Sequence, residues 1–168
     1  MTDVSVTVLL RGNVETRLKK VESGEVDGTL LALAGLKRLG LEAHASELLP
    51  LDKFLPAAGQ GAIGITCRAA DVGARAALAP ILDEATGFAL AAERSFLTVL
   101  DGSCRTPIAA YARIEGKQLV FSGEVLRADG AEVFAAKGRG APVDAAMIGY
   151  HAGHDILLRL PHGVAGLV

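Results

Sequence analysis

The apolar and polar positions in the first part of the chain alternate between short buried runs and one helical stretch. Three apolar runs predict buried strands, at residues 4–10, 28–34 and 62–67. Between the first two, residues 14–22 carry an apolar stripe at helical spacing, and Asn13 stands where an N-cap is expected. Strand, helix and strand in succession predict a parallel βαβ unit, which is typical of an α/β domain.

The pattern changes after residue 80. Apolar positions recur at helical spacing over residues 85–99, whereas Glu93 and Arg94 are expected to face elsewhere. Three alternating runs then predict strands, at residues 107–114, 118–126 and 132–138, separated by turn signals at Glu115-Gly116 and Asp129-Gly130. Two further helices are expected, over residues 72–79 after Asp71 and over residues 145–159. The pattern of this part therefore predicts a small α+β domain, a three-stranded antiparallel sheet with helices on one face.

Composition and net charge exclude several classes of function. Apolar residues make up 51% of the 168 residues and charged residues 21%, so the chain can form a core. A net charge of −2 offers no basic surface for nucleic acid or an anionic membrane. No apolar run reaches the roughly 18 residues of a membrane span, and no signal peptide pattern opens the chain. A cytoplasmic protein is expected, with no disulfide framework from its two cysteines.

Cys104 is the first candidate for chemistry. It lies between a predicted helix end and a predicted strand start, and the neighbouring Arg105 favours the thiolate. A reactive thiol without a nearby histidine suits covalent attachment better than a protease-type relay. The pattern leaves open that Cys104 is a small buried hydrophobe, which is how Cys67 is interpreted from its alternation with Ile63 and Ile65.

Arginines form the second candidate set. Arg11, Arg17 and Arg38 follow the predicted strands or open the next helix, and ligands of open α/β sheets bind at those strand ends. Guanidinium groups converging there would bind carboxylates, and the alternative is three unrelated surface arginines.

Two weaker motifs complete the candidate sites. The turn at Gln60 and Gly61 lacks the spacing of a nucleotide-binding loop and fits a hinge or a ligand-contacting turn. The His151 and His154 pair stands without further ligands, so no metal site is expected.

Four blocks of sequence together resemble one family, the hydroxymethylbilane synthases (porphobilinogen deaminases). The blocks are Arg11-Gly12-Asn13-Val14-x-Thr16-Arg17-Leu18, Ala34-Gly35-Leu36-Lys37-Arg38-Leu39-Gly40, Pro56-Ala57-x-Gly59-Gln60-Gly61-Ala62, and Ala92-Glu93-Arg94 leading to Gly102-x-Cys104-x-x-Pro107-Ile108. They occur in the order and at the spacing of the family, and the resemblance runs from about residue 6 to residue 160.

The resemblance implies an activity and a cofactor. The family are transferases that join four porphobilinogen units into hydroxymethylbilane, with release of ammonia, in haem and other tetrapyrrole biosynthesis. Their dipyrromethane cofactor is attached by a thioether to the cysteine that matches Cys104. The arginines matching Arg11 and Arg17, with Arg38 as a further member, are implied to hold the carboxylates of cofactor and substrate.

The resemblance also implies a domain layout. Residues 1–56 correspond to the remainder of a truncated, periplasmic-binding-protein-like α/β domain, and residues 57–80 to a hinge, strand and helix that return to a missing first domain. Residues 81–168 correspond to the α+β domain that carries the cofactor. The catalytic aspartate of the family belongs to the missing part, and no acid of this chain matches it. The chain alone is therefore expected to be inactive.

Other interpretations remain open. The chain could be one half of a split enzyme that pairs with an N-terminal polypeptide, or a non-catalytic module that binds porphobilinogen and polypyrroles. Self-association is a further way to cover the edges of an incomplete sheet.

Overall fold

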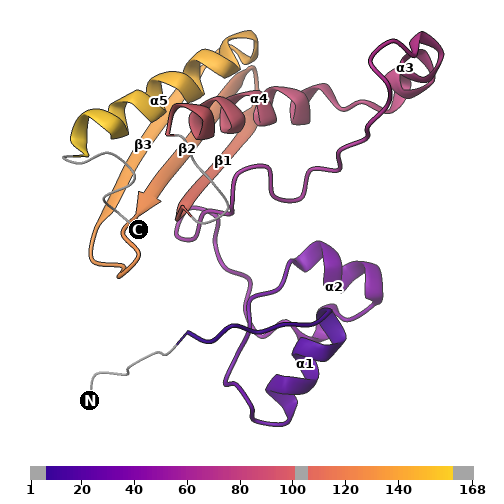
Figure 1. Cartoon of the computed structure of the whole chain (residues 1–168), viewed down its shortest axis with the longest axis vertical. Coiled ribbons are helices and arrows are strands. Elements are labelled where there is room, and N and C mark those ends of the chain that lie inside the picture. The colour runs from indigo at the N-terminus through magenta and orange to yellow at the C-terminus, as the bar shows by residue number, and fades with distance from the viewer. Residues whose placement is uncertain (1–6, 101–105, 161–168) are drawn as a thin grey trace. The chain divides into compact units, whose positions relative to one another are not determined.

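The computed structural model describes residues 7–100 and 106–160, which fall into two compact units, Met1–Leu49 and Pro50–Val168. Figure 1 shows the elements in chain order. The first unit contains α1 (Val14–Glu22), α2 (Leu33–Leu39) and η1 (Glu42–His44). The second contains α3 (Val72–Leu78), η2 (Ala79–Ile81), α4 (Glu84–Val99), β1 (Ile108–Glu115), β2 (Gln118–Leu126), β3 (Val133–Gly140), η3 (Pro142–Asp144) and α5 (Ala145–Arg159).

Helix α1 confirms the predicted helix and its cap. The Asn13 side-chain oxygen accepts the backbone N–H of Thr16 at 2.9 Å and the Thr16 hydroxyl at 2.8 Å. This satisfies one of the N–H groups that the first turn of a helix leaves without a partner. Helix α2 ends at Gly40, whose φ of 66° is the left-handed conformation that glycine adopts without strain. Local sequence therefore accounts for both of these helix ends.

The three strands predicted from apolar runs before residue 70 are wrong. Residues 7–10, 28–32 and 62–68 are not in strands, and within the described ranges the single sheet is β1–β2–β3. The side chains of Leu30 and Ile63 are 63% and 85% exposed rather than buried. A parallel strand depends on neighbouring strands for its backbone hydrogen bonds, and these segments have no such neighbour. The α+β part of the fold prediction holds, and the parallel βαβ unit does not.

The three-stranded antiparallel sheet confirms the prediction for the second unit. Strand β2 is central, with β1 on one side and β3 on the other. The connections turn at Gly116 and Gly130, with φ values of 61° and 72°. These are the turn positions that the Glu115-Gly116 and Asp129-Gly130 pairs predict.

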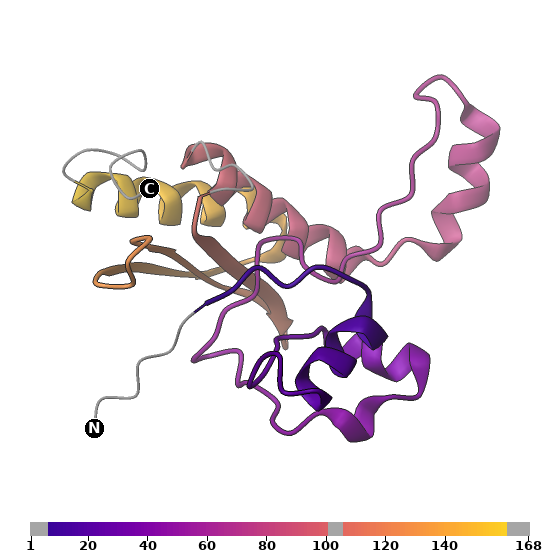
Figure 2. The same cartoon turned by 60° about the horizontal axis from the view of Figure 1, so that its bottom comes forward.

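Helices α4 and α5 pack side by side on one face of this sheet, as both views show (Figures 1 and 2). The core lies between the helices and the sheet, where the rings of Phe96 and Phe121 are 5.2 Å apart and inclined by 59°. The largest fully buried side chains are Phe96, Phe121, Leu100, Leu119, Ile156 and Val125. The predicted helices over residues 85–99 and 145–159 are thus confirmed, together with their position on one face.

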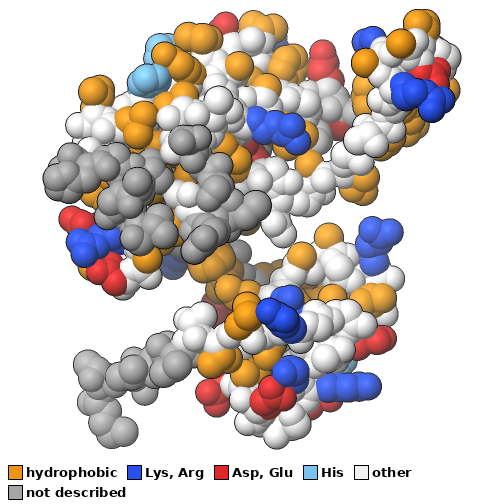
Figure 3. All heavy atoms as spheres, viewed as in Figure 1, with side chains coloured by type: hydrophobic (Ala, Val, Ile, Leu, Met, Phe, Trp, Pro, Cys, Tyr) orange, Lys and Arg blue, Asp and Glu red, His pale blue; other side chains and the backbone are white. Residues whose placement is uncertain are grey.

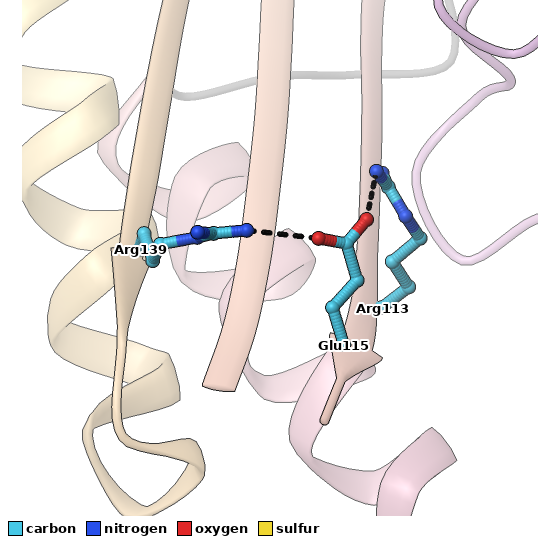
Figure 4. A network of polar contacts seen from close by, with 3 residues as sticks. All are labelled: Arg113, Glu115 and Arg139. Carbon is cyan, nitrogen blue, oxygen red and sulfur yellow. Dashed lines mark hydrogen bonds and ion pairs between the residues drawn. The ribbon is translucent and has the colours of Figure 1, made fainter. Parts of the chain in front are cut away.

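The other face of the sheet carries polar side chains. Arg139 Nη2 donates to Glu115 Oε2 at 2.8 Å, and Arg113 binds the other oxygen of the same carboxylate (Figure 4). The register places Glu124 on this face between Ala109 and Ala135. Partial burial disfavours the charged carboxylate and raises the pKa of Glu124 above its ordinary value of 4.5.

The raised pKa of Glu124 predicts a pH-dependent term in stability. The folded state holds the Glu124 proton more tightly than the unfolded state, so this contribution is present below pH 4.5 and is lost as pH rises through the folded-state pKa. Glu124→Gln is therefore expected to raise the melting temperature at neutral pH and to flatten its fall between acidic and neutral pH. Thermal unfolding followed across that range measures this, with the exposed Glu47→Gln as the matched control. An unchanged pH profile in Glu124→Gln would contradict it.

Large apolar side chains are exposed on both units (Figure 3). In the first unit, Val8 and Leu9 are 56% and 83% exposed. In the second, Ile81 and Leu82 are 66% and 69% exposed. Among the described residues, no helix has both the length and the hydropathy needed to cross a membrane.

Candidate functional site

The turn that leads into α1 brings Arg11 and Arg17 to one end of that helix. Gly12 has a φ of 125°, and a Cβ there would lie 2.8 Å from the Thr16 side chain, so the turn requires glycine. Arg17 Nε donates to the Gly12 carbonyl at 3.1 Å, which orients the guanidinium toward the turn. Arg11, directly before the glycine, is exposed. The two arginines therefore flank the same short turn.

Arg38 belongs to the neighbouring helix α2. The two helices approach at Val14 and Gly35, where the Val14 side chain lies 3.9 Å from an ideal Cβ position on the glycine. Arg17 follows Val14 by about one helical turn, and Arg38 follows Gly35 by the same spacing. Each arginine therefore lies on the same face of its helix as the contact residue. In the described part of the chain, none of the three arginines forms an ion pair with a carboxylate. Their charge is available for an external anion.

The second predicted site element, the turn at Gln60 and Gly61, lies in the other compact unit. It is a tight turn with φ values of 73° at Gly59 and 84° at Gly61, and the Gln60 N–H donates to the Ala57 carbonyl at 3.0 Å. The turn is attached to the sheet, because the Pro56 carbonyl accepts the N–H of Ala110 at 3.0 Å. It is thus an ordered turn, joined to strand β1.

Glu93 makes the remaining attachment, and sequence reasoning missed it. Its side chain is only 6% exposed, whereas the helical pattern placed it outside the core. Glu93 Oε2 accepts the N–H of Gly59 at 2.6 Å, and Oε1 accepts the N–H of Ala112 at 2.8 Å. Arg94 is exposed as predicted. The sequence did contain a signal for the burial of Glu93, because residue 93 follows Ala89 by four positions and so lies at the edge of the apolar stripe.

A shallow hollow of about 200 Å³ lies where this turn meets α4 and β1. Gln60 and Gly61 line it from the turn, with Thr86 from α4 and Tyr111 from β1. Glu93 lines it as well, so the polar side chains of the lining are an amide, two hydroxyls and one carboxylate. Such a surface can accept a small polar group.

The two cysteines and the histidine pair are the remaining residues that the sequence singled out. Cys104 and Arg105 lie outside the described residues. Cys67 is exposed, so its predicted core position is wrong, because the strand that would have buried it does not form. His151 and His154 lie against the Tyr150 ring, at 5.7 Å and 4.3 Å between ring centres. The described residues contain no cluster of three or more side chains able to hold a metal ion.

Comparison with known proteins decides the family. A family model described as porphobilinogen deaminase, dipyromethane cofactor binding domain, matches residues 2–76. A second, described as porphobilinogen deaminase, C-terminal domain, matches residues 88–157. The chain belongs to the porphobilinogen deaminase family. The family predicted from the four sequence blocks is thereby confirmed.

Two bacterial relatives show the extent of the match. The porphobilinogen deaminase of Nitrobacter winogradskyi is 52% identical over 147 residues, covering 88% of this chain and 46% of the relative. That of Nitrobacter hamburgensis is 49% identical over 154 residues, covering 92% of this chain and 48% of the relative. The chain therefore spans about half the length of the porphobilinogen deaminases it matches.

The two matched regions divide the candidate residues between them. Arg11, Arg17 and Arg38 fall within residues 2–76, the region matched to the cofactor binding domain, as do Gln60 and Gly61. Cys104 falls within residues 88–157, the region matched to the C-terminal domain. Dipyrromethane is thus the cofactor of the family to which the chain belongs.

Proposed function

We propose that this chain is the cofactor-carrying portion of a hydroxymethylbilane synthase, which polymerises four porphobilinogen units with release of ammonia. The observation that carries the proposal is the pair of family models, which between them match the chain from residue 2 to residue 157 with one short gap. The order of the four motif blocks along the chain supports the same interpretation.

Carboxylate binding is the role we propose for Arg11, Arg17 and Arg38. Each pyrrole unit carries two carboxylates, so the growing product is a polyanion that needs a basic surface. The planar guanidinium matches a carboxylate with two parallel N–H groups, which lysine cannot do. The available charge of the three arginines and the hydrogen bond that orients Arg17 fit such a ligand.

Cys104 is the residue we propose as the cofactor attachment point. Its thiolate, favoured by Arg105, would be the sulfur of the thioether to dipyrromethane. When bound, that cofactor supplies the primer to which the pyrrole units are added. The guanidinium groups fit the acidic side chains of dipyrromethane by charge and shape.

The domain layout and the acid–base group complete the proposal. We infer that residues 1–56 belong to a periplasmic-binding-protein-like domain, residues 57–80 to a connecting segment, and residues 81–168 to the cofactor-carrying domain. No acid of the chain matches the family's catalytic carboxylate, and loss of such a group typically costs about 100-fold to 10,000-fold in rate. The relatives are about twice as long as the stretch that matches this chain, so we propose that turnover depends on the part of the family's sequence that these 168 residues do not include.

Co-expression tests the proposal directly. The chain is produced with and without the N-terminal half of the Nitrobacter winogradskyi porphobilinogen deaminase, and each product is assayed with porphobilinogen and weighed by intact-mass spectrometry. We expect deaminase activity, and the added mass of dipyrromethane on this chain, only in the co-expressed pair. A pair that forms but neither gains mass nor consumes porphobilinogen would contradict the proposal. Binding by the isolated chain without turnover would instead indicate a non-catalytic module.

The two cysteines give a matched pair of variants for that experiment. Cys104→Ala is expected to abolish both the added mass and the activity of the pair, because Cys104 is the cysteine that lies within the motif blocks. Cys67→Ala is expected to leave both unchanged, since that exposed thiol lies outside the motif blocks. Peptide mapping locates the modified residue. Retention of the added mass in Cys104→Ala would refute the attachment site.

Arg17→Gln tests the carboxylate-binding role. Removal of the guanidinium is expected to weaken porphobilinogen binding to the co-expressed pair about 10-fold to 100-fold, since a hydrogen bond to a charged group contributes about 1.5–3 kcal/mol. Isothermal titration measures the dissociation constant. Arg68→Gln is the control, because the Arg68 side chain is 90% exposed and pairs only loosely with Asp71. Equal losses in the two variants would point to a general charge effect.

A further inference from the structure

Two hydrogen bonds join the turn of residues 56–61 to β1 and α4, and the side chain that makes the second also binds β1 through a third hydrogen bond. The Pro56 carbonyl accepts from Ala110 at 3.0 Å. The Glu93 carboxylate then accepts from Gly59 at 2.6 Å on one oxygen and from Ala112 at 2.8 Å on the other. Glu93 therefore links the turn, helix α4 and strand β1 at a single point.

Burial makes this link strong. Glu93 is the buried charged residue among those described, at 6% exposure. In the described residues, no buried side-chain nitrogen or oxygen lacks a hydrogen-bond partner. Hydrogen bonds from N–H groups to an ionised carboxylate are shorter and stronger than those to a neutral oxygen. Loss of the carboxylate would leave the two amides without their acceptor, beside a glycine turn that has little stiffness of its own.

The chemistry of the link requires glutamate. Both partners are N–H donors, so both side-chain oxygens must accept. Glutamine has one carbonyl oxygen, and its NH₂ group would face an N–H donor. Aspartate is shorter by one methylene. A neutral side chain of the same size can therefore keep only one of the two bonds.

We propose that Glu93 is a positioning residue that holds the Gly59-Gln60-Gly61 turn, so that Gln60 presents its amide at the hollow shared with Tyr111. This proposal rests on the proposed function, in which Gln60 contacts the cofactor or substrate. Glu93 also lines the hollow, but both its side-chain oxygens already accept backbone N–H groups. It acts through the shape of the turn.

The first test needs no variant. In the isotopically labelled chain, NMR is expected to detect scalar coupling across the hydrogen bond between the Gly59 nitrogen and the Glu93 side-chain carboxyl carbon. Absence of coupling at both Gly59 and Ala112 would overturn the proposal, whatever happens to any variant.

The second test is amide hydrogen exchange in Glu93→Gln. We expect exchange at Gly59 or Ala112 to accelerate at least about 10-fold, the effect of losing a charge-assisted hydrogen bond. The amide of Phe121 in β2 reports global opening and is expected to change much less. Glu84→Gln is the matched control, because Glu84 lies on the same helix but is exposed. Equal acceleration at all amides would show a general stability effect and overturn the positioning role.

The third test links the turn to the ligand through a double-mutant cycle. Porphobilinogen binding to the co-expressed pair is measured for Gln60→Ala, Glu93→Gln and the double variant. If Glu93 acts through Gln60, each single change weakens binding and the double variant is little weaker than either. If the losses of affinity in the two single variants instead add up in the double variant, Glu93 does not act through Gln60. Failure of the unmodified pair to bind porphobilinogen would refute the proposed function and the ligand role of the turn, while the two NMR tests still decide whether Glu93 positions it.

Discussion

Replacing Gly149 by alanine is expected to disrupt the C-terminal domain. A Cβ at Gly149 would lie 1.9 Å from the Ala92 carbonyl oxygen, which belongs to the backbone of α4 and cannot rotate away. Helices α4 and α5 would have to separate, and their separation would disrupt the core beneath them. We expect a loss of about 3 kcal/mol or more, at the upper end of overpacking effects. Urea unfolding followed by circular dichroism measures it.

Gly87→Ala is the control for that experiment and should act in the opposite direction. Gly87 lies in α4, and nothing is within 4 Å of its ideal Cβ position. Alanine is favoured over glycine inside a helix by up to about 1 kcal/mol, so this variant is expected to be slightly more stable. Equal stability of the two variants would show that the close approach at Gly149 is not a constraint.

Phe96→Ala is expected to lower the free energy of unfolding by a similar amount. The cause here is a cavity in the core rather than a steric clash. Phe96 is fully buried, its ring lies 5.2 Å from that of Phe121, and it occupies the space that the missing side chain of Gly123 leaves open. Truncation of a buried phenylalanine typically costs about 3–5 kcal/mol. The midpoint of urea unfolding should fall accordingly, with loss of the cooperative transition if the domain no longer folds.

Phe54→Ala distinguishes loss of the core from loss of any aromatic side chain. Phe54 is 51% exposed, and exposed substitutions usually change stability by less than about 0.5 kcal/mol. A small effect is therefore expected in the same assay. A loss at Phe54 as large as at Phe96 would mean that the two side chains are buried alike in solution.

Both stability variants also bear on the proposed site. Phe96 and Glu93 are neighbours on α4, and the hydrogen bonds of Glu93 depend on the position of that helix against β1. Variants that loosen the helix layer are thus expected to release the Gly59 turn as well. Glu93→Gln, by contrast, should release the turn while the layer stays packed.

Local sequence was sufficient wherever an element supplies its own partners. The cap at Asn13, the turns at Gly116 and Gly130, and helices α4 and α5 were all predictable, because each depends on residues a few positions apart. The antiparallel sheet also followed from its pattern, since consecutive strands joined by tight turns pair with one another. The family resemblance, carried by short motifs, was accessible on the same grounds.

Tertiary structure decided the features that depend on distant partners. The apolar runs at residues 28–34 and 62–67 have the pattern of strands but form none, because a strand needs neighbours that a local pattern cannot provide. The acceptors for Gly59 and Ala112 are 34 and 19 positions away on one buried carboxylate that the helical period had placed outside the core. Charge and spacing identify a glutamate on a helix, whereas burial and hydrogen bonding at that position arise only when the helix, the turn and the sheet are assembled.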